Sequence, residues 1–393
     1  MIDTKLFREF FNSEKSGGIV LIACTIASLL LTNIFIGTGF IDFWHHKLGF
    51  EAGAVKLNLS LEHWINDGLM TVFFLLIGLE IERELYDGEL SNIRNAMLPL
   101  AAAVGGMLLP ALIHFGLNRG TVYQDGFGIP MATDIAFALG VLALAGKKVP
   151  LALKVFLTAL AIIDDLGAIL IIAIFYSHDL QTLWLFSALG IFGLLLILNR
   201  LKVHILLPYI AGGIIMWYCM LQSGIHATIT GVLLAFAIPF GDGKERSPSY
   251  RLQHFLHIPV AFIIVPLFAL ANTGIPLNAD SGKNLTTTNS LGIVGGLLFG
   301  KPAGILLFCF LAIKLRITKL PEAVNWRQLA GAGVLAGIGF TMSIFITLLA
   351  FNDTLTVQDS KIAILAASLL AGVTGFFLIK NATRTAVKEN KVT

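Results

Sequence analysis

Two neighbouring aspartates, Asp164 and Asp165, lie inside the apolar run from Val149 to Tyr176. An ionised side chain at bilayer depth costs about 2.5–3.5 kcal/mol of insertion free energy, so such residues are usually functional. Two adjacent carboxylates in a site of low dielectric titrate as a coupled pair. A small hard cation such as Na⁺ or Li⁺ prefers oxygen ligands and can replace their protons. The pair is therefore a candidate site at which a cation and protons compete.

Two further charges interrupt apolar runs. Asp134 follows Thr133 in a short run that ends at Leu144, and Lys301 lies in the run from Leu291 to Ile313. Asp134 would neutralise the partial positive charge of helix N-termini, or serve structure alone. Lys301 would balance helix ends or pair with an aspartate. Because buried lysines release their proton readily, a direct part of Lys301 in proton traffic stays open.

A second group of titratable residues lies inside or at the ends of the expected spans. The acidic and basic residues after Leu79 form either a solvated helix end or a rim that attracts cations and responds to pH. His226, inside an apolar run, is either a pH sensor or a hydrogen-bonded packing residue. The pH-response candidates are Glu80, Arg83, Glu84, His226, His254 and His257.

The composition indicates that lipid is the solvent for most of the chain. Of 393 residues, 56% are hydrophobic and 13% are charged, whereas soluble domains carry roughly 25% charged residues. Twelve apolar stretches of spanning length can be marked. We expect one all-α polytopic membrane domain over residues 1–393, with about 12 transmembrane helices and no nucleic-acid surface.

The distribution of Lys and Arg predicts the orientation. With the amino terminus inside, 20 basic residues fall in cytoplasmic segments and 5 fall outside. Short cytoplasmic loops carry the excess of positive charge. Both termini are therefore expected on the cytoplasmic side.

The two triplets of spans at about 95–176 and 290–380 run in opposite directions and predict an inverted repeat. Their middle members, spans 4 and 11, both contain residues that can interrupt a helix. Span 4 carries Pro130 and Gly140, and span 11 contains the glycine-rich run 331–339. Interrupted spans at matching positions are typical of the midplane site of a transporter. Glycines that merely allow tight helix packing are the alternative for span 11.

Residues 49–61 are the one segment with an alternation of apolar and polar residues, after a turn signal at Gly53. This pattern predicts a small extracytoplasmic β-hairpin. Its edge could pair with a second copy in a homodimer, or the hairpin could lie on its own membrane domain.

Three motifs make the pattern specific: Ala132–Gly140 (ATDIAFALG), Ala159–Ile169 (ALAIIDDLGAI) and Gly337–Phe345 (GIGFTMSIF). With them the chain resembles the NhaA-type sodium/proton antiporters of bacterial inner membranes over nearly its whole length. This family is among the transporters from which the pattern of interrupted spans is known.

The resemblance implies twelve spans, with broken, crossing helices at spans 4 and 11, and a homodimer formed through the hairpin. It implies electrogenic, pH-regulated exchange of Na⁺ for H⁺ without a cofactor, in pH homeostasis and salt tolerance, with Li⁺ as a further candidate substrate. Asp164 and Asp165 would hold the ion and protons, with Thr133, Asp134 and Lys301 as supporting residues. The six pH-response candidates fall on positions that the family associates with pH regulation.

Three residues depart from the family pattern: Gln253, Tyr250 and Glu82. All lie in the regulatory region, so we expect transport with a displaced or blunted pH threshold. The alternative function is a proton-coupled carrier of a small organic solute, although the spans offer few polar residues for one. An intramembrane aspartyl protease fits less well, because its two aspartates usually come from different helices.

Overall fold

The computed structural model describes residues 4–52, 55–146, 148–177, 180–241, 243, 247–277, 284–321 and 323–389. Within these residues the chain is mostly helical, and its helices cluster into two compact units. Unit 1 comprises Met1–Ile19, Gly88–Ala168 and Asn278–Thr393, and unit 2 comprises Val20–Asp87 and Ile169–Leu277. Segments far apart in the sequence therefore build each unit.

The expected multi-pass helical architecture is confirmed. Nine helical segments of the described chain are long and apolar enough to cross a membrane, and one bent pair would count as a tenth. The two further expected spans correspond to α9 (Leu207–Ser223), with 17 residues, and α10 (Ile229–Ala237), with 9 residues. α9 stops where Gly224 takes a left-handed backbone (φ 82°), and α10 stops at Ile238, which is extended before a proline. The number twelve stays a prediction.

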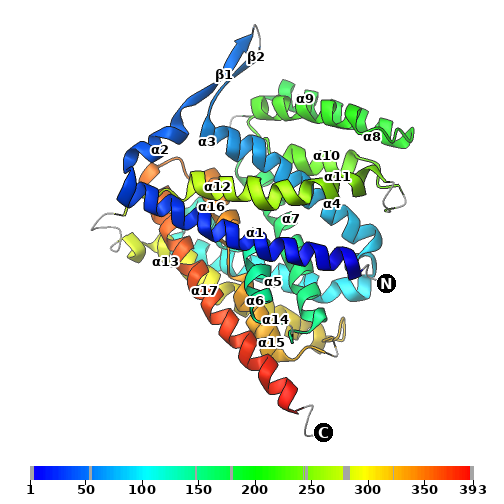
Figure 1. The fold of residues 1–393 in the computed structure, drawn as a ribbon, viewed down its shortest axis with the longest axis vertical. Coiled ribbons are helices and arrows are strands. Elements are labelled where there is room, and N and C mark those ends of the chain that lie inside the picture. Colours follow the sequence, from blue (N-terminus) through cyan, green and yellow to red (C-terminus); the bar gives the residue numbers. More distant parts are fainter. Residues whose placement is uncertain are drawn as a thin grey trace. The chain divides into compact units, whose positions relative to one another are not determined.

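Unit 1 contains the helices that carry the aspartates and the buried lysine. They are α5 (Ile93–Asn118), α6 (Ile135–Leu144), α7 (Leu151–Phe175, through Ala168), α13 (Thr288–Gly295), α14 (Lys301–Lys314), α15 (Trp326–Ala336), α16 (Phe340–Ala350) and α17 (Thr354–Glu389) (Figure 1). A 3-10 turn, Gln124–Met131, precedes α6, and a π turn, Gly296–Gly300, leads into α14. Gly105 and Gly304 allow α5 and α14 to approach so closely that a Cβ on either would overlap the other backbone.

Helix ends in unit 1 follow from local side-chain caps. Asn325 and Gln328 form a reciprocal capping box at the start of α15. α15 ends at Ala336, α16 begins at Phe340, and the two axes differ by 43°. In the loop before α17, the Asp353 carboxylate accepts from the Thr356 amide (2.9 Å) and hydroxyl (2.7 Å). These hydrogen bonds hold the pKa of Asp353 below its usual value.

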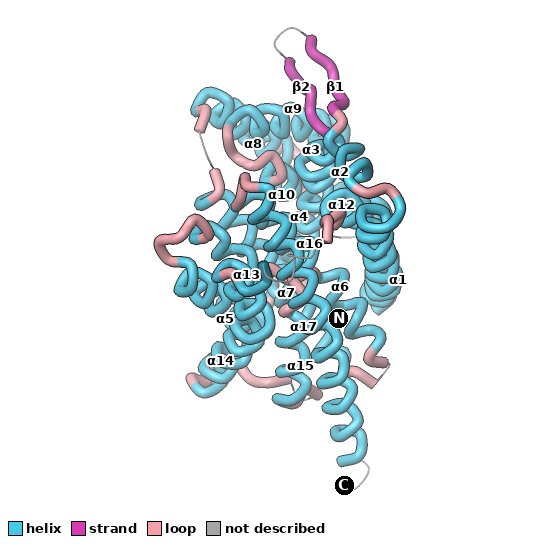
Figure 2. The backbone as a smooth tube through the Cα atoms, turned by 90° about the vertical axis from the view of Figure 1, so that its left-hand side faces the viewer, coloured by secondary structure: helices cyan, strands magenta, loops and turns pink. Residues whose placement is uncertain are grey.

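Unit 2 contains the remaining helices and one hairpin. They are α1 (Thr4–Leu30, from Val20), α2 (Thr38–His45), α3 (Leu61–His63), α4 (Met70–Asp87), α8 (Thr182–Arg200), α9, α10, α11 (Pro248–Pro259) and α12 (Val265–Asn272). The antiparallel strands β1 (Lys47–Ala52) and β2 (Val55–Ser60) pair from Lys47 with Ser60 to Ala52 with Val55. They extend away from α2 and α3 (Figure 2). The expected hairpin is thus confirmed as a two-stranded sheet, while its turn at Gly53 lies outside the described residues.

Candidate functional site

Asp164 and Asp165 lie on α7 and are buried, with 0% and 1% of their surfaces exposed. Adjacent helical residues point about 100° apart, so the two carboxylates face different surroundings. The Asp164 Oδ2 accepts from the Thr133 hydroxyl at 2.8 Å and lies 2.9 Å from the Lys301 ammonium. Its Oδ1 has no hydrogen-bond partner among the described residues. Asp164 is thus a compensated carboxylate with one oxygen still able to take a ligand.

Lys301 is the first residue of α14 and is completely buried. Besides its ion pair with Asp164, its Nζ donates to the Met131 carbonyl at the end of the 3-10 turn. Asp165 also attracts this ammonium electrostatically. An unpaired ammonium in the interior would be very unfavourable, so these oxygens account for its position. The structure therefore brings Lys301 together with both aspartates.

Thr133 and Asp134 lie in the irregular segment between the 3-10 turn and α6. The Asp134 amide donates to the Ile338 carbonyl at 2.7 Å, and the Thr133 hydroxyl is 3.0 Å from the Ala336 carbonyl. The interruption around Asp134 therefore contacts the interruption between α15 and α16 directly. Ser343 closes the same contact, because its hydroxyl donates to the Ile129 carbonyl at 2.7 Å.

The Asp134 carboxylate joins the start of two helices. It accepts from the Phe137 amide at 2.9 Å, which makes it the N-cap of α6. It also accepts from the Thr341 amide at 3.1 Å and from the Thr341 hydroxyl, in the first turn of α16. A negative charge at two helix N-termini is electrostatically favourable. Its part in the charge balance of the broken helices stays a prediction.

The sequence did not single out Thr341 as a site residue, nor the carbonyls of Met131, Ala336 and Ile338. A hydroxyl just after a glycine-rich break was the available signal for Thr341, since such residues often contact helix ends. Every residue has a backbone carbonyl, so residue types do not indicate which carbonyls belong to a site. The structure is needed to show which carbonyls the two interrupted segments bring together.

The pH-response candidates of unit 2 gather mainly where α4 meets α11. The Glu80 carboxylate lies 3.4 Å from His257 Nε2, and Arg83 lies 3.6 Å from Glu84. His254 stacks on Tyr250 with ring centroids 6.3 Å apart and is near enough to His257 for electrostatic repulsion. These contacts define the Glu80 cluster, formed by Glu80, Arg83, Glu84, His254 and His257.

The three departures from the family pattern lie on the same two helices. Glu82 is 4% exposed and accepts from the Ser249 hydroxyl at 3.1 Å, while Gln253 is also 4% exposed. His226 has a different environment: its Nε2 is 2.9 Å from the Tyr176 carbonyl. That contact is typical of a hydrogen-bonded packing histidine.

Among the described residues, no group of three or more His, Cys, Asp or Glu is placed to hold a metal ion. Oxygens of other kinds are plentiful around Asp164, including a threonine hydroxyl and the Met131 carbonyl that Lys301 contacts. Hard monovalent cations accept such mixed oxygen ligands together with water. The donor set therefore suits a transported cation.

Comparison with known proteins assigns the chain to a family. A family model described as Na⁺/H⁺ antiporter 1 matches residues 8–379. The chain is 60% identical over 388 residues to the Na⁺/H⁺ antiporter NhaA of Flavobacterium psychrophilum, covering 99% of both chains. It is 59% identical to the NhaA of Dechloromonas aromatica, covering 95% of both, and 48% identical to that of Citrobacter koseri, covering 95% of this chain and 97% of the relative. The chain thus belongs to the Na⁺/H⁺ antiporter 1 family.

Proposed function

We propose that this membrane protein exchanges Na⁺ for protons through Asp164 and Asp165. The observation that carries the proposal is the buried Asp164 carboxylate, held by Lys301 and Thr133 beside two interrupted helices. Na⁺ and H⁺ are the transported substrates, and Li⁺ is a further candidate. Neither a cofactor nor an enzymatic step is part of the proposal.

The ion pair suggests how a cation would enter. The Lys301 ammonium lies 2.9 Å from Asp164 Oδ2, so a Na⁺ ion bound at Oδ1, which is free within the described chain, would share this carboxylate with a second positive charge. Two positive charges on one buried carboxylate repel each other strongly in a low dielectric. Na⁺ binding therefore requires Lys301 to move away or to lose its proton. Either step couples cation binding to the position or the protonation of Lys301.

We propose that the two interrupted segments allow the site to open to one side of the membrane at a time. Hydrogen bonds join the segment around Asp134 to the segment between α15 and α16 and the start of α16. They include those from the Asp134 amide to the Ile338 carbonyl and from the Ser343 hydroxyl to the Ile129 carbonyl. We propose that these segments are the broken, crossing helices of an inverted repeat over about 95–176 and 290–380, within one transporter domain. In transporters built from such repeats, alternating access is movement of one bundle against another around the fixed site.

Two finer properties belong to the same proposal. If both aspartates release a proton for each Na⁺, one net charge crosses the membrane per cycle, so membrane potential would drive exchange. The Glu80 cluster would set the pH of activation, because it gathers two carboxylates, two imidazoles and a guanidinium where α4 meets α11. His226 is included through the resemblance alone, since its hydrogen bond to Tyr176 supports a packing role.

We place the protein in the bacterial cytoplasmic membrane with both termini inside, as the basic residues indicate. β1 and β2 form a two-stranded sheet in the described part of the chain, and strand pairing through such a hairpin supports a homodimer. Removing the hairpin would then yield monomers, which size measurements in detergent can test. These monomers should still exchange ions in vesicles.

The partners of Asp134 and Asp164 favour transport over peptide cleavage. Asp134 binds helix N-termini and Thr341, whereas Asp164 binds Lys301 and Thr133. An aspartyl protease needs two carboxyl groups that face one water molecule. These two carboxylates are committed to different partners.

The direct test is Na⁺-induced collapse of an imposed pH gradient in inside-out vesicles between pH 6.5 and 8.5. The native chain should collapse the gradient, and Asp165→Asn should not, at equal amounts of inserted protein. If the native chain gave no Na⁺ response at any pH, the antiporter proposal would fail and a carrier of an organic solute would become the leading alternative.

A further inference from the structure

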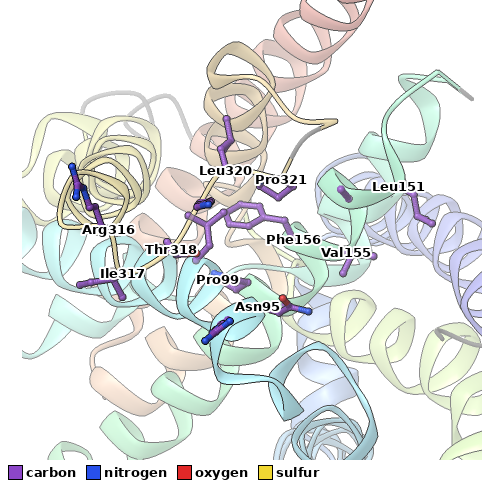
Figure 3. A pocket seen from close by; sticks show the side chains of 15 residues that line it. Asn95, Pro99, Leu151, Val155, Phe156, Arg316, Ile317, Thr318, Leu320 and Pro321 are labelled. Carbon is purple, nitrogen blue, oxygen red and sulfur yellow. The ribbon is translucent and has the colours of Figure 1, made fainter.

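Unit 1 contains a pocket of about 940 Å³. It shares no lining residue with the aspartate cluster, which is formed by Thr133, Asp134, Asp164, Asp165 and Lys301. Three segments line it: the start of α5, the start of α7, and residues 316–321 after α14. Figure 3 shows Phe156 of α7 between Thr318 and Pro321 of the loop and Pro99 and Asn95 of α5. Ile93, Leu151 and Lys314 are the end residues of three candidate spans, so the segments that line the pocket meet where lipid headgroups are expected.

The charges around this pocket have one sign. Arg94, Arg316 and Lys319 belong to its lining and are exposed, and no described lining residue is acidic. None of the three has an ion-pair partner among the described residues. Three uncompensated cations attract an anion and lower the local concentration of Na⁺. The pocket is therefore a poor entry path for the transported cation.

The walls of the pocket are apolar. Leu98, Pro99, Val155, Phe156, Leu320 and Pro321 contribute to them. A free inorganic anion would leave these walls in contact with water. A molecule with an anionic head and hydrocarbon chains would satisfy both the rim and the walls.

We propose that the pocket binds an anionic phospholipid of the phosphatidylglycerol type. Arg94, Arg316 and Lys319 hold the headgroup phosphate, and an acyl chain lies against Phe156 and its apolar neighbours. The pocket reaches Ala159, five residues before Asp164 and thus about 7.5 Å along the axis of α7. A bound lipid would therefore steady the part of α7 that leads to the ion site.

The test measures binding of dioleoyl phosphatidylglycerol to the purified full chain by native mass spectrometry. Each basic residue near an anionic headgroup contributes about fivefold to binding. The triple variant Arg94→Gln, Arg316→Gln, Lys319→Gln should therefore bind the lipid at least about tenfold more weakly. Arg327→Gln removes an exposed charge that does not line the pocket and should bind it as the native chain does.

A second variant separates pocket binding from general surface charge. Ala152→Trp fills the pocket and leaves all charges in place, so it should also weaken phosphatidylglycerol binding. Phosphatidylcholine should bind at least tenfold more weakly than phosphatidylglycerol, and millimolar inorganic phosphate should not displace the lipid. Equal binding by the native chain and both pocket variants would overturn the proposal. Displacement by phosphate would overturn it in favour of a soluble anion site.

Discussion

The aspartate cluster of unit 1 and the Glu80 cluster of unit 2 both bury carboxylates, but they compensate the charge differently. Asp164 pairs with a lysine at 2.9 Å, whereas Glu80 pairs with a histidine at 3.4 Å. An ammonium ordinarily keeps its charge throughout the physiological pH range, and an imidazole does not. The first arrangement suits a site where a cation must compete for a carboxylate. The second suits a site whose charge balance follows pH.

Loss of either aspartate should have the largest effect. Asp164→Asn and Asp165→Asn each remove an oxygen charge that Na⁺ needs, so exchange should fall to the background of empty vesicles. Glu80→Gln, which also neutralises one buried carboxylate, should retain exchange at its optimal pH. Gradient collapse in vesicles with matched protein levels measures all three. Equal loss in Glu80→Gln would abolish the distinction between the clusters.

Lys301→Met should be the next largest change, in stability as well as transport. Removing one member of a buried ion pair typically costs 3–5 kcal/mol, because the other charge is left without compensation, and we expect about that loss. Adding Asp164→Asn removes the remaining charge and should restore most of the thermal stability in detergent, without restoring exchange. If the double variant were as unstable as Lys301→Met, the two side chains would not be energetically coupled.

Asp134→Ala should destabilise the contact between the two interrupted segments. It deletes the N-cap of α6 and the acceptor for Thr341, a loss of about 1–2 kcal/mol by the usual effect of a helix cap. Thr341→Val removes only the hydroxyl contact and should cost less, about 1 kcal/mol. Denaturation of both variants in detergent compares the two, and a larger effect of Thr341→Val would contradict this account of Asp134.

The smallest effects should come from the Glu80 cluster. His257→Gln removes the imidazole that contacts the Glu80 carboxylate, so the pH of half-maximal exchange should move by up to about one unit while the maximal rate stays within about twofold. His226→Gln should leave that pH unchanged, because its ring binds the Tyr176 carbonyl. Exchange rates from pH 6 to 9 provide the comparison. A shift with His226→Gln and none with His257→Gln would reverse the assignment.

The sequence singled out charged residues of unit 1 but not the groups that contact them. Charges such as Asp134 and Lys301 are conspicuous in apolar runs, and the insertion cost made them candidates. Nothing in the residue types indicated that Asp134 would accept from Thr341 or that Lys301 would reach the Met131 carbonyl, since these contacts join segments 170 or more positions apart. Hydrophobicity also overestimated the length of the helix at α10, which begins only at Ile229 and ends at Ala237.

The most direct test of the central claim is proton release when Na⁺ is added to the purified protein in weakly buffered detergent solution. If cation and protons compete for Asp164 and Asp165, the native chain and Glu80→Gln should release protons on Na⁺ addition, and both aspartate variants should release none. Unchanged release by Asp164→Asn and Asp165→Asn, or its loss in Glu80→Gln alone, would contradict the account.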